Sequence, residues 1–274
     1  MSTASALTAR IAGLHVVAVG TGAPLLVAHG GPGMSHDLYR SLDPLGDGRQ
    51  LVFWDHRGHG RSERLPDGPV SMSLFADDVV AVADGLGIDR FAVFGHSFGG
   101  WVAQEVALRH PDRIAAVVLA GTTPGQLGTT ESPDDDQGPP PPAELAALLG
   151  ELPETDAGLV ELYVALAPYF TRTADPSAIR DAIDPTLVSA DSCRRVFDAL
   201  SRWSAVDRLG GIDSPTLLVA GRYDDFCSVQ QHERIARRVA DSDLAVIDRA
   251  GHFTWLERPE VLDLIADWLH RLGR

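Results

Sequence analysis

The stretch Arg90–Trp101, RFAVFGHSFGGW, decides the fold of this chain. Residues 91–94 form a short apolar run of the length of a buried strand. Gly95–Gly99 (GHSFG) then fits the pattern G-x-S-x-G, and residues 100–110 have the apolar positions of a helix. A strand, a tight turn and a helix in this order form the context in which the pattern holds a nucleophilic serine.

The turn needs glycine for a steric reason. A serine at so sharp a turn has a strained backbone, and Gly95 and Gly99 remove the Cβ atoms that would collide there. The helix begins just beyond Ser97, so its unpaired N–H groups face any negative charge that develops at the serine. A glycine-rich turn can also hold a serine by chance. The interpretation of Ser97 as a nucleophile therefore depends on partners elsewhere in the chain.

Composition limits the class of protein. The 274 residues fit one large domain, or a core with an insertion, and 45% of them are hydrophobic. The formal charge of −15 argues against nucleic acid as a partner. All the cationic residues are arginine, which excludes chemistry that needs a lysine, such as a Schiff base.

Other sequence features point to a soluble, cytoplasmic protein. No apolar run reaches the length of a membrane span, and the N-terminal residues MSTASALTAR do not resemble a signal peptide. Cys193 and Cys227 form no cluster of metal-ligand spacing. We expect no metal and no cofactor, and the sequence leaves the oligomeric state open.

Short apolar runs alternate with helical segments along most of the chain, which predicts an α/β fold with a mostly parallel sheet covered by helices on both faces. The expected strands are 11–19, 25–28, 51–54, 91–94, 114–120, 216–220 and 244–247. The rhythm stops at Gly121, and the residues that follow read as short helices broken by prolines. We therefore expect core segments at 1–121 and 209–274, with a helical cap at 122–208 inserted after the strand 114–120.

The predicted cap is strongly acidic. Residues 122–207 contain 15 acidic and 5 basic residues. This charge could be the solvated surface of a lid, or a field that attracts cationic or amine-bearing substrates.

Two further residues could activate the serine. A serine hydroxyl needs a base to take its proton, normally a histidine that a buried carboxylate orients. Asp224 follows the expected strand 216–220, and His252 follows the expected strand 244–247. Both thus lie at the carboxyl ends of strands, where open α/β sheets build their sites. Asp225 is the alternative to Asp224.

At this point the chain resembles the α/β-hydrolase superfamily, in particular its proline iminopeptidase-like and esterase-like branches. The resemblance covers nearly the whole chain except the cap. The motifs that carry it are HGGPG at 29–33, DHRGHGRS at 55–62, GHSFG at 95–99, GRYD at 221–224 and GH at 251–252.

The resemblance implies a role for each matching residue. Ser97 corresponds to the nucleophile, His252 to the general base and Asp224 to the orienting acid. The backbone N–H groups of Gly31 and Phe98 correspond to the oxyanion hole.

Three more residues, Gly30, His96 and Phe253, are assigned to the substrate-binding surface, although His96 could instead make local contacts. The ring of Phe98 is expected to border the pocket, and Trp101 to belong to the core.

Three functions are consistent with this pattern. The first is a serine hydrolase that cleaves a small ester, thioester, lactone or amide through an acyl-enzyme. The second is an iminopeptidase that releases N-terminal proline from a short peptide, with Glu144, Glu151, Glu154 or Glu161 as partner of the substrate amine. Iminopeptidases commonly have tryptophan after the nucleophile, where this chain has Phe98. The third is a non-hydrolytic member that binds a ligand or serves a biosynthetic pathway.

Overall fold

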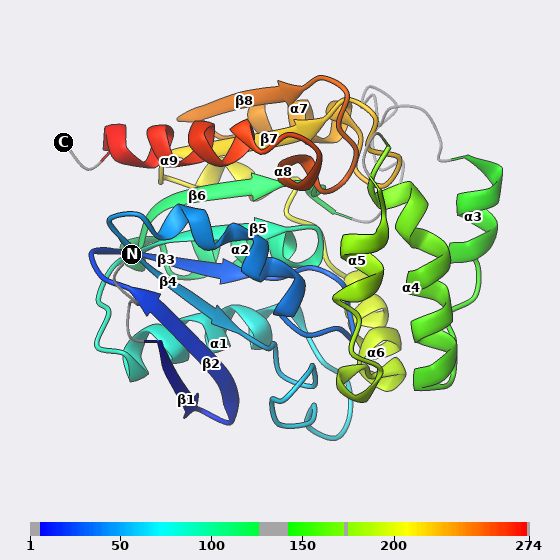
Figure 1. Cartoon of the computed structure of the whole chain (residues 1–274). Coiled ribbons are helices and arrows are strands. Elements are labelled where there is room, and N and C mark those ends of the chain that lie inside the picture. Colours follow the sequence, from blue (N-terminus) through cyan, green and yellow to red (C-terminus); the bar gives the residue numbers. More distant parts are fainter. Residues whose placement is uncertain (1–5, 126–141, 173–174, 273–274) are drawn as a thin grey trace.

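The computed structural model describes residues 6–125, 142–172 and 175–272 of the chain (Figure 1). Part of the predicted cap, including most of its acidic, proline-rich segment, therefore lies outside the described residues. One eight-stranded sheet has the order β1-β2-β4-β3-β5-β6-β7-β8. The strands are β1 (Leu7–Ile11), β2 (Leu14–Gly20), β3 (Ala23–Ala28), β4 (Arg49–Trp54), β5 (Phe91–His96), β6 (Ile114–Ala120), β7 (Thr216–Gly221) and β8 (Ser242–Ile247).

The pairing of the strands confirms the predicted fold class. Strands β3 to β8 pair in parallel, whereas β1 and β2 form an antiparallel hairpin at one edge. The sequence predicted a single strand over residues 11–19 there. Ala12 and Gly13 instead adopt positive φ angles of 48° and 82°, and the chain reverses between two strands. The hydrophobic alternation runs through both strands, so it does not reveal this turn.

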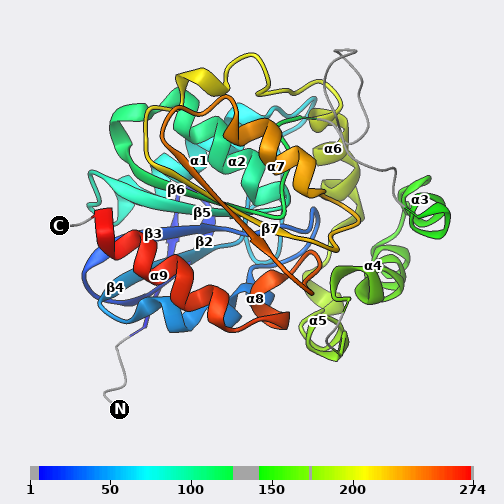
Figure 2. The same ribbon diagram turned by 90° about the horizontal axis from the view of Figure 1, so that it is seen from above.

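Helices cover both faces of the sheet (Figure 2). One layer contains α1 (Met72–Gly85), α2 (Phe98–Arg109) and α7 (Val229–Ala236), and the other contains η1 (Asp37–Gly46), α8 (Thr254–Glu257) and α9 (Glu260–Leu272). Short 3₁₀ turns, η2 (Pro111–Arg113) and η4 (Leu209–Gly211), precede β6 and β7. Among the described residues, none of the helices combines the length and the apolar character that a membrane crossing requires.

Strand β5 shows how the sheet links the two layers. All six of its residues are buried. Phe91 and Val93 pack in the core beneath α1 and α2, whereas Ala92 and Phe94 pack in the core on the opposite face. This is the alternation of side chains that a strand buried on both faces requires. The strand is thereby fixed on both sides just before Ser97.

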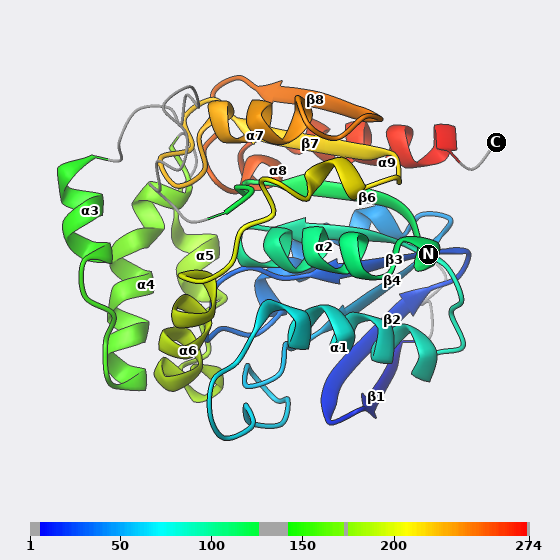
Figure 3. The same ribbon diagram turned by 180° about the vertical axis from the view of Figure 1, so that it is seen from behind.

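A group of helices lies beyond the carboxyl ends of the strands, between β6 and β7 in sequence (Figures 1 and 3). It comprises α3 (Ala143–Leu149), α4 (Asp156–Phe170), α5 (Ser177–Asp181), η3 (Pro185–Leu187) and α6 (Ala190–Leu200). Tyr163 of α4 donates its hydroxyl to the carbonyl of Pro32 at 2.9 Å, and the N–H of Ser189 donates to the carbonyl of Gly33 at 2.9 Å. These helices therefore cover the loop that follows β3.

Replacing Gly99 with alanine is expected to destabilise the fold by about 3 kcal/mol or more, because overpacking against a rigid neighbour cannot relax. A Cβ atom at Gly99 would lie 1.9 Å from the backbone oxygen of Ala28. Gly210→Ala is the matched control, since its nearest atom would be 3.8 Å away. Urea denaturation of both variants measures the difference. An equally stable Gly99→Ala variant would contradict this close approach.

Candidate active site

Ser97 lies at the turn between β5 and α2, as the sequence predicted. Its φ angle is +53°, a left-handed conformation that side chains rarely adopt. The turn is fixed by two backbone hydrogen bonds, from the N–H of Ser97 to the carbonyl of Ala120 at 3.1 Å and from the N–H of Gly100 to the carbonyl of Ser97 at 2.9 Å. A Cβ atom at Gly95 would lie 2.3 Å from the oxygen of Gly99. Both glycines are therefore needed for the turn.

His252 and Asp224 form a buried hydrogen-bonded pair. Nδ1 of His252 lies 2.9 Å from Oδ2 of Asp224, and both side chains are at most 2% exposed. The other oxygen of Asp224 accepts the N–H groups of Phe226 and Cys227 at 2.8 and 2.9 Å. Because the carboxylate only accepts, Nδ1 of His252 carries the proton, and Nε2 is left as an acceptor.

Asp225, the sequence alternative, has a different environment. Its carboxylate binds Nη1 of Arg172 at 2.7 Å, and burial raises the pKa of this carboxyl. Among the hydrogen bonds of the described residues, His252 is paired with Asp224 and not with Asp225. The geometry thus favours Asp224 as the orienting group.

A chain of buried hydrogen bonds joins His252 to the loop after β3. Nε2 of His96 lies 3.0 Å from the carbonyl oxygen of His252, and Nδ1 of His96 lies 2.6 Å from the hydroxyl of Tyr39. Since the carbonyl can only accept, Nε2 donates, and the Tyr39 hydroxyl donates to Nδ1. The Tyr39 oxygen in turn accepts the N–H of Gly30 at 2.8 Å. Both ring nitrogens of His96 are therefore occupied, while the residue also lines the cavity described below, so its assignment to the substrate-binding surface stays a prediction.

The loop that contains Gly30 and Gly31 borders the same cavity as Ser97. Gly31 has a φ angle of +74°, and a Cβ atom at Gly30 would lie 2.9 Å from the Cβ of Ser97. Phe98 begins α2 directly after the serine. Its ring, which was expected to border the cavity, instead packs 5.2 Å from the ring of Phe75 in the core. Only the backbone of Phe98 remains as a candidate for the site.

Three histidines are buried together under this loop. The ring centroids of His29 and His56 are 4.3 Å apart, and His59 lies 5.8 Å from each. Nδ1 of His29 hydrogen-bonds with the Gly30 carbonyl at 2.8 Å, and Nε2 of His29 accepts the N–H of His56. Burial lowers the pKa of His29 to about 3 and that of His59 to about 4. All three histidines thus remain neutral near pH 7.

Stability is expected to fall as the pH drops from 7 to 5. Histidines in the unfolded chain bind protons below about pH 6.5, whereas His29 and His59 in the folded protein do not. Each contributes a loss of about 2 kcal/mol over this interval. Urea denaturation at pH 7, 6 and 5 measures the slope, and His59→Gln should reduce it. A free energy of unfolding that stays constant over this range would refute the buried neutral state.

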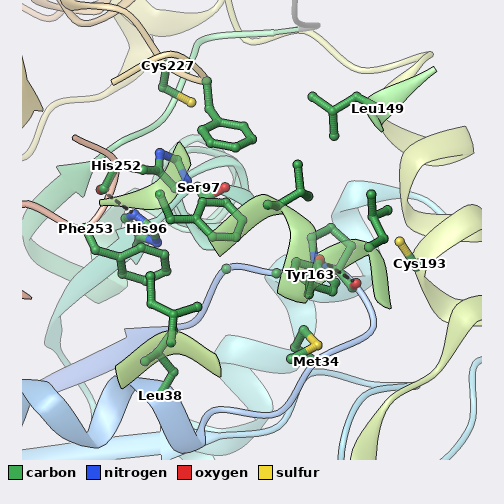
Figure 4. Close-up of a pocket in the computed structure, with 18 of the residues that line it drawn as sticks. Met34, Leu38, His96, Ser97, Leu149, Tyr163, Cys193, Cys227, His252 and Phe253 are labelled. Carbon is green, nitrogen blue, oxygen red and sulfur yellow. Dashed lines mark hydrogen bonds between the residues drawn. The ribbon is translucent and has the colours of Figure 1, made fainter. Parts of the chain in front are cut away.

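A cavity of about 730 Å³ lies between these loops and helices α3 to α6. Ser97 and His252 face one end of it (Figure 4). Phe253, assigned to substrate binding from the sequence, lines the wall, with its ring 4.5 Å from that of His96. The cavity thus has the catalytic candidates at one end and the helical segment as its roof.

Several lining residues carried no motif in the sequence. Trp101 belongs to the buried core, as expected, and also lines the cavity, where its Nε1 donates to the hydroxyl of Thr123 at 3.0 Å. Tyr39, Cys193 and Cys227 are also part of the wall. Tyr39 belongs to η1, in which no local sequence pattern distinguishes the inward-facing positions.

One group of side chains could in principle hold a metal ion. The potential ligand atoms of Asp224, Cys227 and His252 all lie within 4.8 Å of one another. Both oxygens of Asp224 already accept hydrogen bonds, and one of those bonds comes from His252 itself. Burial raises the pKa of the Cys227 thiol well above its ordinary value, which disfavours the thiolate that a metal needs. These donors fit a hydrogen-bonded pair better than a metal site, and the absence of a metal stays a prediction.

Comparisons with known proteins agree with this architecture. The family model described as alpha/beta hydrolase fold matches residues 23–184. The chain is 30% identical to a 2-hydroxymuconate semialdehyde hydrolase of Pseudomonas sp. (strain CF600), over 91% of this chain and 88% of that protein. It is 24% identical to the proline iminopeptidase PfmaB of Pestalotiopsis fici, over 88% and 89% of the two chains.

A solved esterase from Exiguobacterium antarcticum has the same fold, with a TM-score of 0.79 and 21% identity over 97% of this chain and all of that one. The family match covers more than half of the chain, and the motifs of the sequence lie where the fold brings strand ends together. The chain belongs to the α/β-hydrolase family and is a hydrolase of that type.

Proposed function

We propose that the protein is a serine hydrolase that cleaves a small ester, thioester, lactone or amide through an acyl-enzyme on Ser97. The observation that carries the proposal is the buried pair of His252 Nδ1 and Asp224 Oδ2 at 2.9 Å, beside a cavity that Ser97 also lines. This pair leaves Nε2 of His252 as an acceptor for the serine proton.

The first half of the reaction forms the acyl-enzyme. The Ser97 oxygen attacks the carbonyl carbon while Nε2 of His252 takes the hydroxyl proton. The carbonyl π electrons move to its oxygen, which the backbone N–H groups of Gly31 and Phe98 stabilise as an oxyanion. When the carbonyl forms again, the bond to the leaving group breaks, and His252 gives its proton to the departing atom. Asp224 stabilises the imidazolium that exists between these two transfers.

The second half releases the acid. A water molecule gives a proton to Nε2 of His252 as its oxygen attacks the acyl carbon, and the bond to Ser97 then breaks with return of the proton to the serine. The water supplies the hydroxyl of the product acid, so atoms and charge balance without a cofactor. In this proposal the core segments 1–121 and 209–274 hold these groups, and the described helices of the cap 122–208 contribute the roof of the substrate pocket.

The iminopeptidase alternative needs a carboxylate that meets the substrate amine. Glu144, Glu151, Glu154 and Glu161 are all exposed, and none of them belongs to the cavity wall. Within the described residues, the lining carboxylates are Asp224 and Asp225, and each is engaged by His252 or by Arg172. The described part of the cap therefore gives this alternative no support.

A panel of matched substrates tests the choice. We expect fast cleavage of 4-nitrophenyl butyrate and slow cleavage of prolyl-4-nitroanilide. Butyryl-4-nitroanilide is an amide without an amine. Comparison with it shows how much of the slower cleavage of the prolyl compound is due to the amine and how much to the lower reactivity of an amide. Since the amine would be buried without a partner, kcat/KM for the prolyl compound should be at least about 100-fold below that of the butyryl anilide. Faster release of proline than of butyrate would instead favour the iminopeptidase.

A further inference from the structure

The wall of the cavity away from Ser97 is apolar. It is formed by side chains of α3 to α6 and their neighbours, several of which Figure 4 shows extending toward the space. Members of this wall from the helical segment are Leu149, Leu159, Leu162, Leu166, Ile179 and Phe197. An apolar wall of this kind stabilises a bound hydrocarbon chain by removing it from water.

Three polar side chains on the wall already have partners in the protein. The Tyr163 hydroxyl donates to the Pro32 carbonyl at 2.9 Å, and Nε1 of Trp101 donates to Thr123 at 3.0 Å. Asp225 binds Arg172 at 2.7 Å. These three side chains therefore leave the apolar residues as the main surface that a substrate meets there.

No arginine belongs to the cavity wall among the described residues. The chain has no lysine, and the sequence of residues 126–141 and 173–174, which the structure does not describe, contains no arginine either. Two carboxylates, Asp224 and Asp225, do line the cavity. A carboxylate on the bound substrate would lose its hydration and meet no arginine or lysine side chain on the described wall.

We propose, on the basis of the serine hydrolase function proposed above, that the cavity takes substrates with an uncharged apolar chain and rejects those with a carboxylate remote from the reacting carbonyl. The chain lies against the leucine and phenylalanine wall, and its carbonyl reaches Ser97. This preference for uncharged substrates distinguishes the protein from the 30% identical 2-hydroxymuconate semialdehyde hydrolase, whose name identifies an acid as its substrate. The same lack of cations favours departure of the acid product after each turnover.

Three esters of equal acyl length test the proposal by their kcat/KM values. They are 4-nitrophenyl hexanoate, the mono-4-nitrophenyl ester of adipate, and the methyl ester of the latter, which is polar but uncharged. We expect the adipate ester to react at least about 100-fold more slowly than hexanoate, because its second carboxylate is desolvated without a partner. The methyl ester should stay within about 10-fold of hexanoate. Equal rates for the charged and neutral compounds would overturn the proposal, while cleavage of any of them supports the serine hydrolase.

A variant that adds a cation should reverse the preference. Leu149 is partly buried at the end of α3 and lines the cavity (Figure 4). Leu149→Arg should raise the rate for the adipate ester relative to hexanoate by about 10-fold or more, whereas Leu149→Gln, of similar length and uncharged, should not. If both variants had the same ratio of adipate to hexanoate rates, the lack of a cation on the wall would not be the cause of the preference.

Ligand binding tests the proposed preference of the cavity independently of the proposed hydrolase activity. Calorimetric titration compares 2-octanone with 7-oxooctanoate, a keto acid of the same length, and requires no turnover. We expect the ketone to bind at least about 100-fold more tightly. Equal affinities would overturn the inference about the cavity whatever the protein hydrolyses. If the ketone is preferred but no ester is cleaved, the proposed function fails and the inference about the cavity holds.

Discussion

Replacing Ser97 with alanine is expected to lower kcat for an aryl ester by about 10⁶-fold, because the acyl-enzyme can no longer form. The fold should be unaffected. Alanine keeps the Cβ atom that the turn already accommodates, and the serine side chain makes no capping hydrogen bond to α2. The backbone bonds from Ser97 to Ala120 and from Gly100 to Ser97 remain available.

Steady-state kinetics on the purified variant measure the loss, and circular dichroism with thermal unfolding verifies that the protein is folded. Full activity in a folded Ser97→Ala preparation would exclude this serine as the nucleophile. Binding of 2-octanone provides the second readout, since the cavity wall is unchanged. A folded variant that binds the ketone but does not turn over assigns the loss to chemistry.

Replacing Asp224 with asparagine is expected to lower kcat by about 10⁴-fold. The N–H groups of Phe226 and Cys227 donate to one oxygen of Asp224 and would hold the amide oxygen in the same place. The amide NH₂ would then point toward Nδ1 of His252, which lies 2.9 Å from Asp224 Oδ2 in the native protein. A donor at that position moves the ring proton to Nε2, and the histidine can no longer accept the proton of Ser97.

Asp225→Asn is the matched control, because it changes the neighbouring carboxylate in the same way. In the described part of the chain, Asp225 pairs with Arg172 at 2.7 Å, whereas the hydrogen bond of His252 goes to Asp224. Its replacement should change kcat by less than about 10-fold. If Asp225→Asn proved the more damaging of the two, the orienting acid would have been assigned to the wrong carboxylate.

The sequence was most informative where local chemistry requires particular residues. The turn at Ser97 needs glycine at Gly95 and Gly99 for steric reasons, and the strand and helix around it have the expected periodicity. Asp224 and His252 follow buried strands, so their convergence follows from a parallel sheet. The hydrogen bond between them is a consequence of the fold that spacing alone cannot establish.

Features that depend on packing between distant segments were not predictable. The inward side of α3 to α6 forms the cavity wall, but any amphipathic helix could direct its apolar residues to a core instead. The glutamates considered as amine partners are exposed, with Glu144 on α3, Glu161 on α4, and Glu151 and Glu154 between these helices. Tyr39 and His96 meet only because η1 packs beside the end of β5, a contact between segments far apart in the chain.

Ser97 is expected to carry the acyl group during turnover, and rapid acid quenching followed by peptide mass spectrometry detects such an adduct. The enzyme is mixed with 4-nitrophenyl hexanoate and stopped within the first turnovers. We expect a hexanoyl group on the peptide that contains Ser97, with no such adduct in Ser97→Ala. A hexanoyl group on another residue, or steady turnover with no acylated peptide at any quench time, would contradict it.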